Sequence, residues 1–63
     1  MNQRKIAAIV KIAQASDLTV KKALLNLTLS RFPKVDPRVV ARKVAAMSGR
    51  RARTSLIQKV VSR

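Results

Sequence analysis

Apolar residues recur at helical spacing along the whole chain. In the first stretch they stand at positions i, i+3, i+4 and i+7, a spacing that places them along one side of an α-helix. Three further stretches carry similar stripes, and none alternates apolar and polar residues as a strand would. The residues expected to face inward are Ile6, Ile9, Val10, Ala13, Val20, Ala23, Leu24, Leu25, Leu27, Val40, Val44, Met47, Leu56, Ile57 and Val60. The pattern predicts an all-α protein, a compact bundle of about four short helices.

Polar residues and proline mark where the first two helices begin and end. The first helix is expected over residues 3–15. Ser16 and Asp17 offer side-chain acceptors to the free amides of a second helix, which is expected to run from residue 18 or 19 to residue 31. The Phe32-Pro33 pair ends that helix, because a residue before proline is pushed out of the helical region.

The second pair of helices is marked in a similar way. Asp36 followed by Pro37 is a strong start signal, since an acid at the N-cap and a proline at the first helical position both favour initiation. The third helix is expected to reach Met47, and Gly49, the only glycine in the chain, is expected to close it in the left-handed conformation. The fourth helix is expected from about residue 51 to the end of the chain.

The two halves of the chain resemble each other when one is shifted by 32 residues. Residues 9–31 then lie over residues 41–63, and six positions carry identical residues. The identities are Lys11 with Lys43, Ala13 with Ala45, Ser16 with Ser48, Leu24 with Leu56, Ser30 with Ser62, and Arg31 with Arg63. Both halves therefore share the layout of helix, short polar turn and helix within one domain. The sequence leaves open whether they arose by duplication.

Charge changes this picture more than any motif does. The 63 residues hold 15 Lys and Arg against two acids, and the resulting net charge of +13 opposes compaction. A simple basic tail would be disordered, but 48% of this chain is hydrophobic and patterned for helices. We therefore expect a polyanion partner. Because Cys and His are absent and Asp17 lies far from Asp36 in the sequence, we expect no metal, no cofactor and no enzymatic activity.

The turn in the first half resembles the helix-turn-helix of DNA-binding proteins, over residues 12–27. In that family a small residue lets two helices cross closely, a place that Ala13 fills here. A small polar residue makes the turn four positions later, where Asp17 stands. Leu18 then occupies the place of an aliphatic residue that plugs the core, and Thr19 the place of a hydroxyl residue that opens the recognition helix.

A second, weaker copy of the motif covers residues 44–58. Ala45 and Gly49 have the same four-residue spacing, whereas Arg50 stands where the aliphatic plug is expected. The resemblance implies that the second helix of a copy enters the major groove of duplex DNA. In that position Arg53 would pair with guanine, and Asn26 or Gln58 with adenine.

Residues 50–53 form the densest basic cluster, at a predicted helix start. Cations oppose the helix dipole there, whereas an anion is favoured where free amides point outward. We interpret this turn as a phosphate site, with a merely solvated run of charge as the alternative. With the flank of the third helix and the recognition helices included, the predicted nucleic-acid-binding residues are Lys21, Lys22, Asn26, Arg38, Arg42, Lys43, Arg50, Arg51, Arg53 and Thr54.

These observations predict a small basic helical protein that binds nucleic acid, first of all duplex DNA, as a transcription regulator or a nucleoid-type architectural factor in the cytoplasm. Two alternatives stay open: an RNA-binding ribosomal or ribonucleoprotein subunit, and a membrane-active, bacteriocin-like cationic peptide. Charges that interrupt every long apolar face count against a membrane partner. We also expect a homodimer, because the aliphatic residues Leu25, Leu29, Val39 and Val61 exceed what one small core can use.

Overall fold

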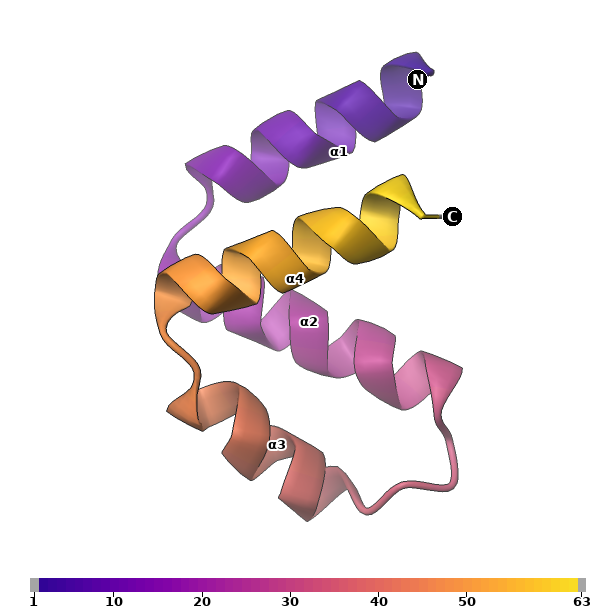
Figure 1. Ribbon diagram of the computed structural model, residues 1–63, viewed down its shortest axis with the longest axis vertical. Coiled ribbons are helices and arrows are strands. Elements are labelled where there is room, and N and C mark those ends of the chain that lie inside the picture. The colour runs from indigo at the N-terminus through magenta and orange to yellow at the C-terminus, as the bar shows by residue number, and fades with distance from the viewer. Residues whose placement is uncertain (1, 63) are drawn as a thin grey trace.

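The computed structural model describes residues 2–62, which form four α-helices and, within that range, no strand (Figure 1). The helices are α1 (Gln3–Gln14), α2 (Asp17–Arg31), α3 (Pro37–Ala46) and α4 (Gly49–Val61). The expected all-α class is thereby confirmed. Arg63, which the predicted fourth helix included, lies outside the described residues.

Each helix begins at a side chain that accepts a hydrogen bond from a free backbone amide. Asn2, Ser16, Asp36 and Ser48 are these N-caps, and the distances from side-chain oxygen to amide nitrogen range from 2.9 to 3.2 Å. Each cap satisfies one of the amides that a helix leaves unpaired in its first turn. Pro37 follows its cap as the first residue of α3, where no amide hydrogen is needed. Short polar residues between the apolar stripes therefore set the helix starts.

Gly49 does not have the role that its place in the sequence suggested. It was expected to end the third helix with a positive φ, but it is the first residue of α4, and no glycine in the described chain has a positive φ. The cause is Ser48, whose Oγ accepts the Arg51 N–H at 3.1 Å and starts α4 two residues earlier than expected. The missing side chain at Gly49 permits a close approach instead, because a Cβ there would overlap the Asp17 carboxylate.

The four helices lie side by side in the order α1, α4, α2, α3 (Figure 1). α2 packs on α4 at the centre, while α1 covers α4 and α3 covers α2. Each half of the chain, α1–α2 or α3–α4, is called a hairpin here. The first helix of each hairpin packs against the second helix of the other hairpin. The body measures 34 × 22 × 13 Å. Because its shortest dimension is close to the diameter of one helix with its side chains, there is room for only a small core.

The core consists of five buried side chains, Val20, Leu24, Val44, Ala52 and Leu56. The apolar pattern identified four of them. It missed Ala52, which has no exposed surface at all, because this alanine stands inside a run of arginines. Its small side chain suits the place where α4 and α2 approach each other.

The apolar stripe predicted on α1 is only partly correct. Ile12 packs against the core, but α1 has no fully buried residue, and Ile6 and Val10 are 49% and 47% exposed. Ala13 and Ala23, which were also expected to face inward, are exposed. The reason is the position of α1 at one edge of the body, where it packs mainly along α4.

The two halves of the chain have matching turns. Ala15 and Met47 follow α1 and α3 with nearly the same backbone angles, φ −73°, ψ 153° and φ −71°, ψ 146°. Ser16 and Ser48 come next, with φ −64°, ψ 157° and φ −65°, ψ 152°. Both pairs are 32 residues apart, the offset at which the sequence resembles itself. The repeat in the sequence therefore corresponds to a repeat in the structure.

An approximate two-fold relation connects the two hairpins. Exchanging the halves leaves the packing scheme unchanged, because α1 packs on α4 as α3 packs on α2. Asp17 and Gly49, which are equivalent residues, meet where α2 and α4 begin. The buried equivalent pairs are Val20 with Ala52 and Leu24 with Leu56. The chain thus has the arrangement of a hairpin dimer within a single polypeptide.

Candidate nucleic-acid interface

The structure divides the ten predicted nucleic-acid-binding residues into two groups by exposure. Lys21 and Arg53 are half-buried, and the other eight are exposed. The exposed residues are Lys22, Asn26, Arg38, Arg42, Lys43, Arg50, Arg51 and Thr54. Lys21 and Arg53 are 32 residues apart and therefore occupy the same place in the two hairpins.

Arg53 makes its hydrogen bonds inside the protein. Its Nε donates to the Ile12 carbonyl at 3.1 Å, and its Nη2 donates to the Ala15 carbonyl at 2.7 Å and to Asp17 Oδ1 at 3.1 Å. The guanidinium thereby binds the last carbonyls of α1, where the helix dipole favours a cation. Only 26% of the Arg53 side chain is exposed. The residue expected to pair with guanine thus has a structural role in this fold.

Lys21 has the matching role at the other hairpin. Its Nζ donates to the Ala45 carbonyl, near the end of α3, at 3.1 Å. Two more cations, Lys5 and Arg31, donate to carbonyls near the end of α4 at 3.3 and 3.5 Å. Three helices therefore end against a basic side chain from another helix, which is the favourable sign of charge for a C-terminus. The sequence contains no local signal that separates these structural cations from the others, apart from the equivalence of Lys21 and Arg53.

Most of the remaining basic side chains have no partner in the described part of the chain. The one ion pair among residues 2–62 joins Arg53 to Asp17, and the Asp36 carboxylate is the N-cap of α3. The basic side chains without a hydrogen bond or an ion pair in that range are Arg4, Lys11, Lys22, Lys34, Arg38, Arg42, Lys43, Arg50, Arg51 and Lys59. Their charge is therefore available to an external anion.

Six of these cations lie on α3 and α4. Lys59 stands near the end of α4, and the other five are called here the α3–α4 basic surface: Arg38, Arg42, Lys43, Arg50 and Arg51. Arg38 and Arg42 are one turn apart, so they lie on the same side of α3. Lys43 and Arg51 line one hollow of about 440 Å³. The connection between α3 and α4 is only two residues long, and it keeps Arg50 and Arg51 next to the end of α3.

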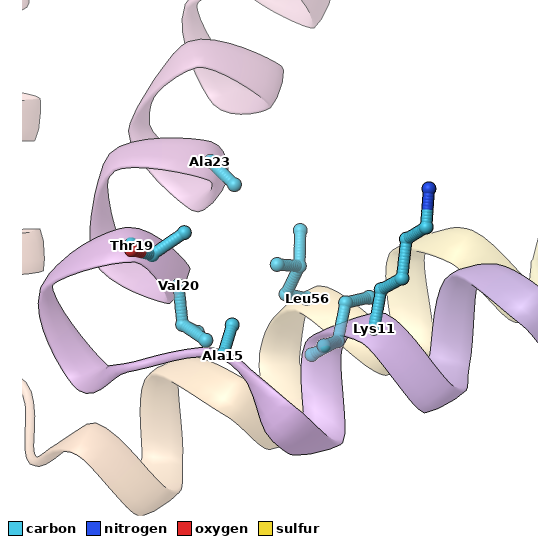
Figure 2. Close-up of a pocket in the computed structure, with 7 residues that line it drawn as sticks. Lys11, Ala15, Thr19, Val20, Ala23 and Leu56 are labelled. Atoms are coloured by element: carbon cyan, nitrogen blue, oxygen red, sulfur yellow. The ribbon is translucent and has the colours of Figure 1, made fainter.

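The first hairpin borders a smaller, apolar hollow. It measures about 140 Å³ and opens among α1, α2 and α4, where Ala15, Thr19 and Ala23 border it (Figure 2). Figure 2 shows Lys11 reaching past its edge with the ammonium group pointing away. The hollow equivalent to it by the 32-residue offset measures about 310 Å³ and is lined by Leu24, Lys43, Val44, Met47 and Ser55 among others. Arg51, the equivalent of Thr19, lines the hollow of about 440 Å³.

The turn of the first hairpin does not pack as the helix-turn-helix resemblance implied. Leu18, expected to plug the core, is 64% exposed, and Ala13, expected at a close helix crossing, is exposed as well. The core contacts on either side of this turn are made instead by Ile12, Ala15 and Val20. Arg50 occupies the equivalent position in the second hairpin and is also exposed, so its charge is not buried. Groove reading by the second helix of each hairpin stays a prediction.

Residues 2–62 contain neither a membrane-spanning helix nor a cluster of metal-ligating side chains. No helix there is long and apolar enough to cross a membrane. No three His, Cys, Asp or Glu side chains gather there as a metal site would require.

Comparison with known proteins does not add a relative. A scan against protein-family models found no matching family, and searches of curated proteins and of solved structures found no match. Inference about function therefore starts from the charge and the geometry of this chain.

Proposed function

We propose that this protein binds duplex DNA as a small nucleoid-type architectural or regulatory factor, and that phosphate contacts supply most of the affinity. The observation that carries the proposal is the charge imbalance: a net +13 on 63 residues, with one ion pair in the described part of the chain. Such a body repels itself, and a bound polyanion relieves that repulsion. A ligand that binds only the folded state would also stabilise a protein with so small a core.

The composition favours a duplex over a single strand. Proteins that bind single-stranded nucleic acid stack the bases on aromatic side chains. This chain has no Trp, no Tyr and one Phe, so it offers no row of aromatic platforms. Arginine and lysine on exposed helix sides suit the regular phosphates of a duplex instead.

In this function, contacts to phosphates contribute more to the affinity than contacts to the bases. Arg53 was the residue expected to pair with guanine, and its hydrogen bonds go to α1 and to Asp17. Contacts made mainly by exposed cations position a protein on DNA without selecting a sequence. We therefore expect similar affinity for duplexes of different sequence, as architectural proteins show.

The proposal is tested by titrating the chain against duplex DNA, duplex RNA and anionic phospholipid vesicles, each at a low and at a physiological salt concentration. We expect tight binding to DNA. The logarithm of the binding constant should fall linearly with the logarithm of the salt concentration, with a slope of about 0.9 for each phosphate contacted. Weak binding at both concentrations, or tight binding that salt does not change, contradicts the proposal. Preference for RNA would favour a ribonucleoprotein role, and preference for vesicles a membrane role.

A further inference from the structure

The two hairpins agree at their structural positions and differ in charge at several exposed ones. The N-caps Ser16 and Ser48 are identical, and Lys21 and Arg53 are both cations that bind the opposite hairpin. At four exposed positions, by contrast, an uncharged residue of the first half corresponds to an arginine of the second. These pairs are Ile6 with Arg38, Val10 with Arg42, Leu18 with Arg50, and Thr19 with Arg51.

Folding does not account for the four arginines. None of their side chains makes a hydrogen bond or an ion pair within the described range. Arg50 and Arg51 also stand in the first turn of α4, where a cation opposes the helix dipole. The equivalent turn of α2 begins with Asp17, whose charge has the favourable sign. The second hairpin therefore carries charge that works against its own stability, and that charge requires an external explanation.

We infer that contact with DNA is one-sided: the α3–α4 basic surface grips the phosphates, and the α1–α2 hairpin does not. This inference rests on the proposed function and adds the place of contact. The ten residues of α3 span about 15 Å. Since each strand of duplex DNA carries one charge per about 3.4 Å of axis, this length matches roughly four or five phosphates. Three of the five cations of the surface lie on α3, and Arg50 and Arg51 extend it from the start of α4.

The opposite edge of the molecule carries fewer cations for phosphate, since Arg4 and Lys11 are the exposed basic residues of α1 without a partner in the described chain. α1 and α3 are the outer helices and lie at opposite edges of the thin body (Figure 1). Where α3 carries Arg38 and Arg42, α1 carries Ile6 and Val10, which offer no charge and no hydrogen-bond donor. One chain therefore has one phosphate-binding edge. A monomer holds one duplex and does not connect two.

The first test compares two triple variants with equal loss of charge. The second-half variant is R38Q/R42Q/R50Q, and the control is R4Q/K11Q/K22Q, whose three residues are also exposed and lack partners in the described chain. With a short DNA duplex at physiological salt, we expect the second-half variant to bind about tenfold or more weakly than the control. Its salt slope should also be shallower by up to about three units. Circular dichroism should show equal helicity.

The outcomes separate the two proposals. Equal losses from both variants, while the wild-type chain binds DNA tightly, would overturn the one-sided contact and leave DNA binding intact. A wild-type chain that does not bind duplex DNA would overturn the proposed function itself, and the one-sided contact with it.

The second test moves arginines to the other edge. The variant I6R/V10R/L18R places arginines in the first hairpin at the positions equivalent to Arg38, Arg42 and Arg50. The chain would then have two phosphate-binding edges. We expect this variant, and not the wild type, to join a donor-labelled to an acceptor-labelled duplex in an energy-transfer assay, at concentrations where sedimentation shows monomers. Bridging by the wild type, or no bridging by the folded variant, contradicts the inference.

Discussion

Arg53 and Asp17 form the ion pair that joins the two hairpins at their turns, with 3.1 Å between Nη2 and Oδ1. The same guanidinium binds two carbonyls near the end of α1, so one side chain connects α1, the start of α2 and α4. Its equivalent, Lys21, reaches only the Ala45 carbonyl near the end of α3. Of these two equivalent cations, the one with more hydrogen bonds to the opposite hairpin therefore comes from the arginine cluster.

Replacing this guanidinium should weaken the fold. We expect R53Q to lower the free energy of unfolding by about 1–3 kcal/mol, because charge-assisted hydrogen bonds to two half-buried carbonyls are lost. The exposed ion pair with Asp17 contributes less. Urea unfolding followed by circular dichroism measures the change. The matched control is R50Q on the same helix, which should stay within about 0.5 kcal/mol of the wild type. Equal losses from R53Q and R50Q would show that Arg53 has no special structural role.

A methyl group at Gly49 should stabilise the protein less than helix propensity alone predicts. In an open helical site, Gly to Ala gains about 0.5–1 kcal/mol. Here the new Cβ would overlap the Asp17 carboxylate, which is exposed and must move away from Arg53 at a small cost. We expect the melting temperature of G49A to stay close to that of the wild type. In a D17A background, where the carboxylate is absent, the same change should be neutral or stabilising. A G49A protein that melts higher in both backgrounds would contradict the close approach.

Enlarging Ala52 should disrupt the central helix pair. This residue has no exposed surface, so A52L forces extra volume between α2 and α4 and should cost about 1–3 kcal/mol or more. Because the core contains only five buried side chains, we expect a large loss of helicity at room temperature. Ala7 is exposed on α1, and A7L should leave helicity nearly unchanged. If A52L and A7L melt alike, the position of Ala52 at the centre is wrong.

The stability of the free chain should rise with salt. The Debye length is about 30 Å at 0.01 M and about 10 Å at 0.1 M ionic strength. Since the body measures 34 × 22 × 13 Å, every charge acts on nearly every other one at low salt and on few at high salt. Thermal unfolding in increasing sodium chloride should therefore show an increasing melting temperature. The less charged variant R4Q/K11Q/K22Q should show a smaller increase, and a melting temperature independent of salt in both would contradict this account.

Self-association is expected once charge is screened. Leu25 and Leu29, counted as surplus apolar residues in the sequence, are half-buried within one chain, but Val39 and Val61 are 46% and 40% exposed. We therefore expect sedimentation to show a dimer whose fraction rises with both protein and salt concentration. A monomer that persists at all concentrations at high salt would exclude the dimer.

The sequence by itself determined the helices and most of the core. Ser16 accepts the Thr19 N–H and Asp36 accepts the Arg38 N–H, so local chemistry specifies where α2 and α3 start. The apolar period identified Val20, Leu24 and Leu56 as inward-facing, because a buried stripe repeats once per turn in any helix that packs along its length. The sequence similarity at an offset of 32 residues likewise predicts two similar hairpins, in agreement with their matching turns.

Only the tertiary structure decided which helix covers which stripe. A period shows that one side of α1 is apolar, but the edge position of this helix leaves Ile6 and Val10 exposed. It also decided the partner of Arg53, whose acceptors are 36 to 41 residues away along the chain and come within reach only when α4 packs on α1. A long cationic side chain has the same local signature whether it binds a carbonyl or faces water. Its role therefore depends on what the rest of the fold brings next to it.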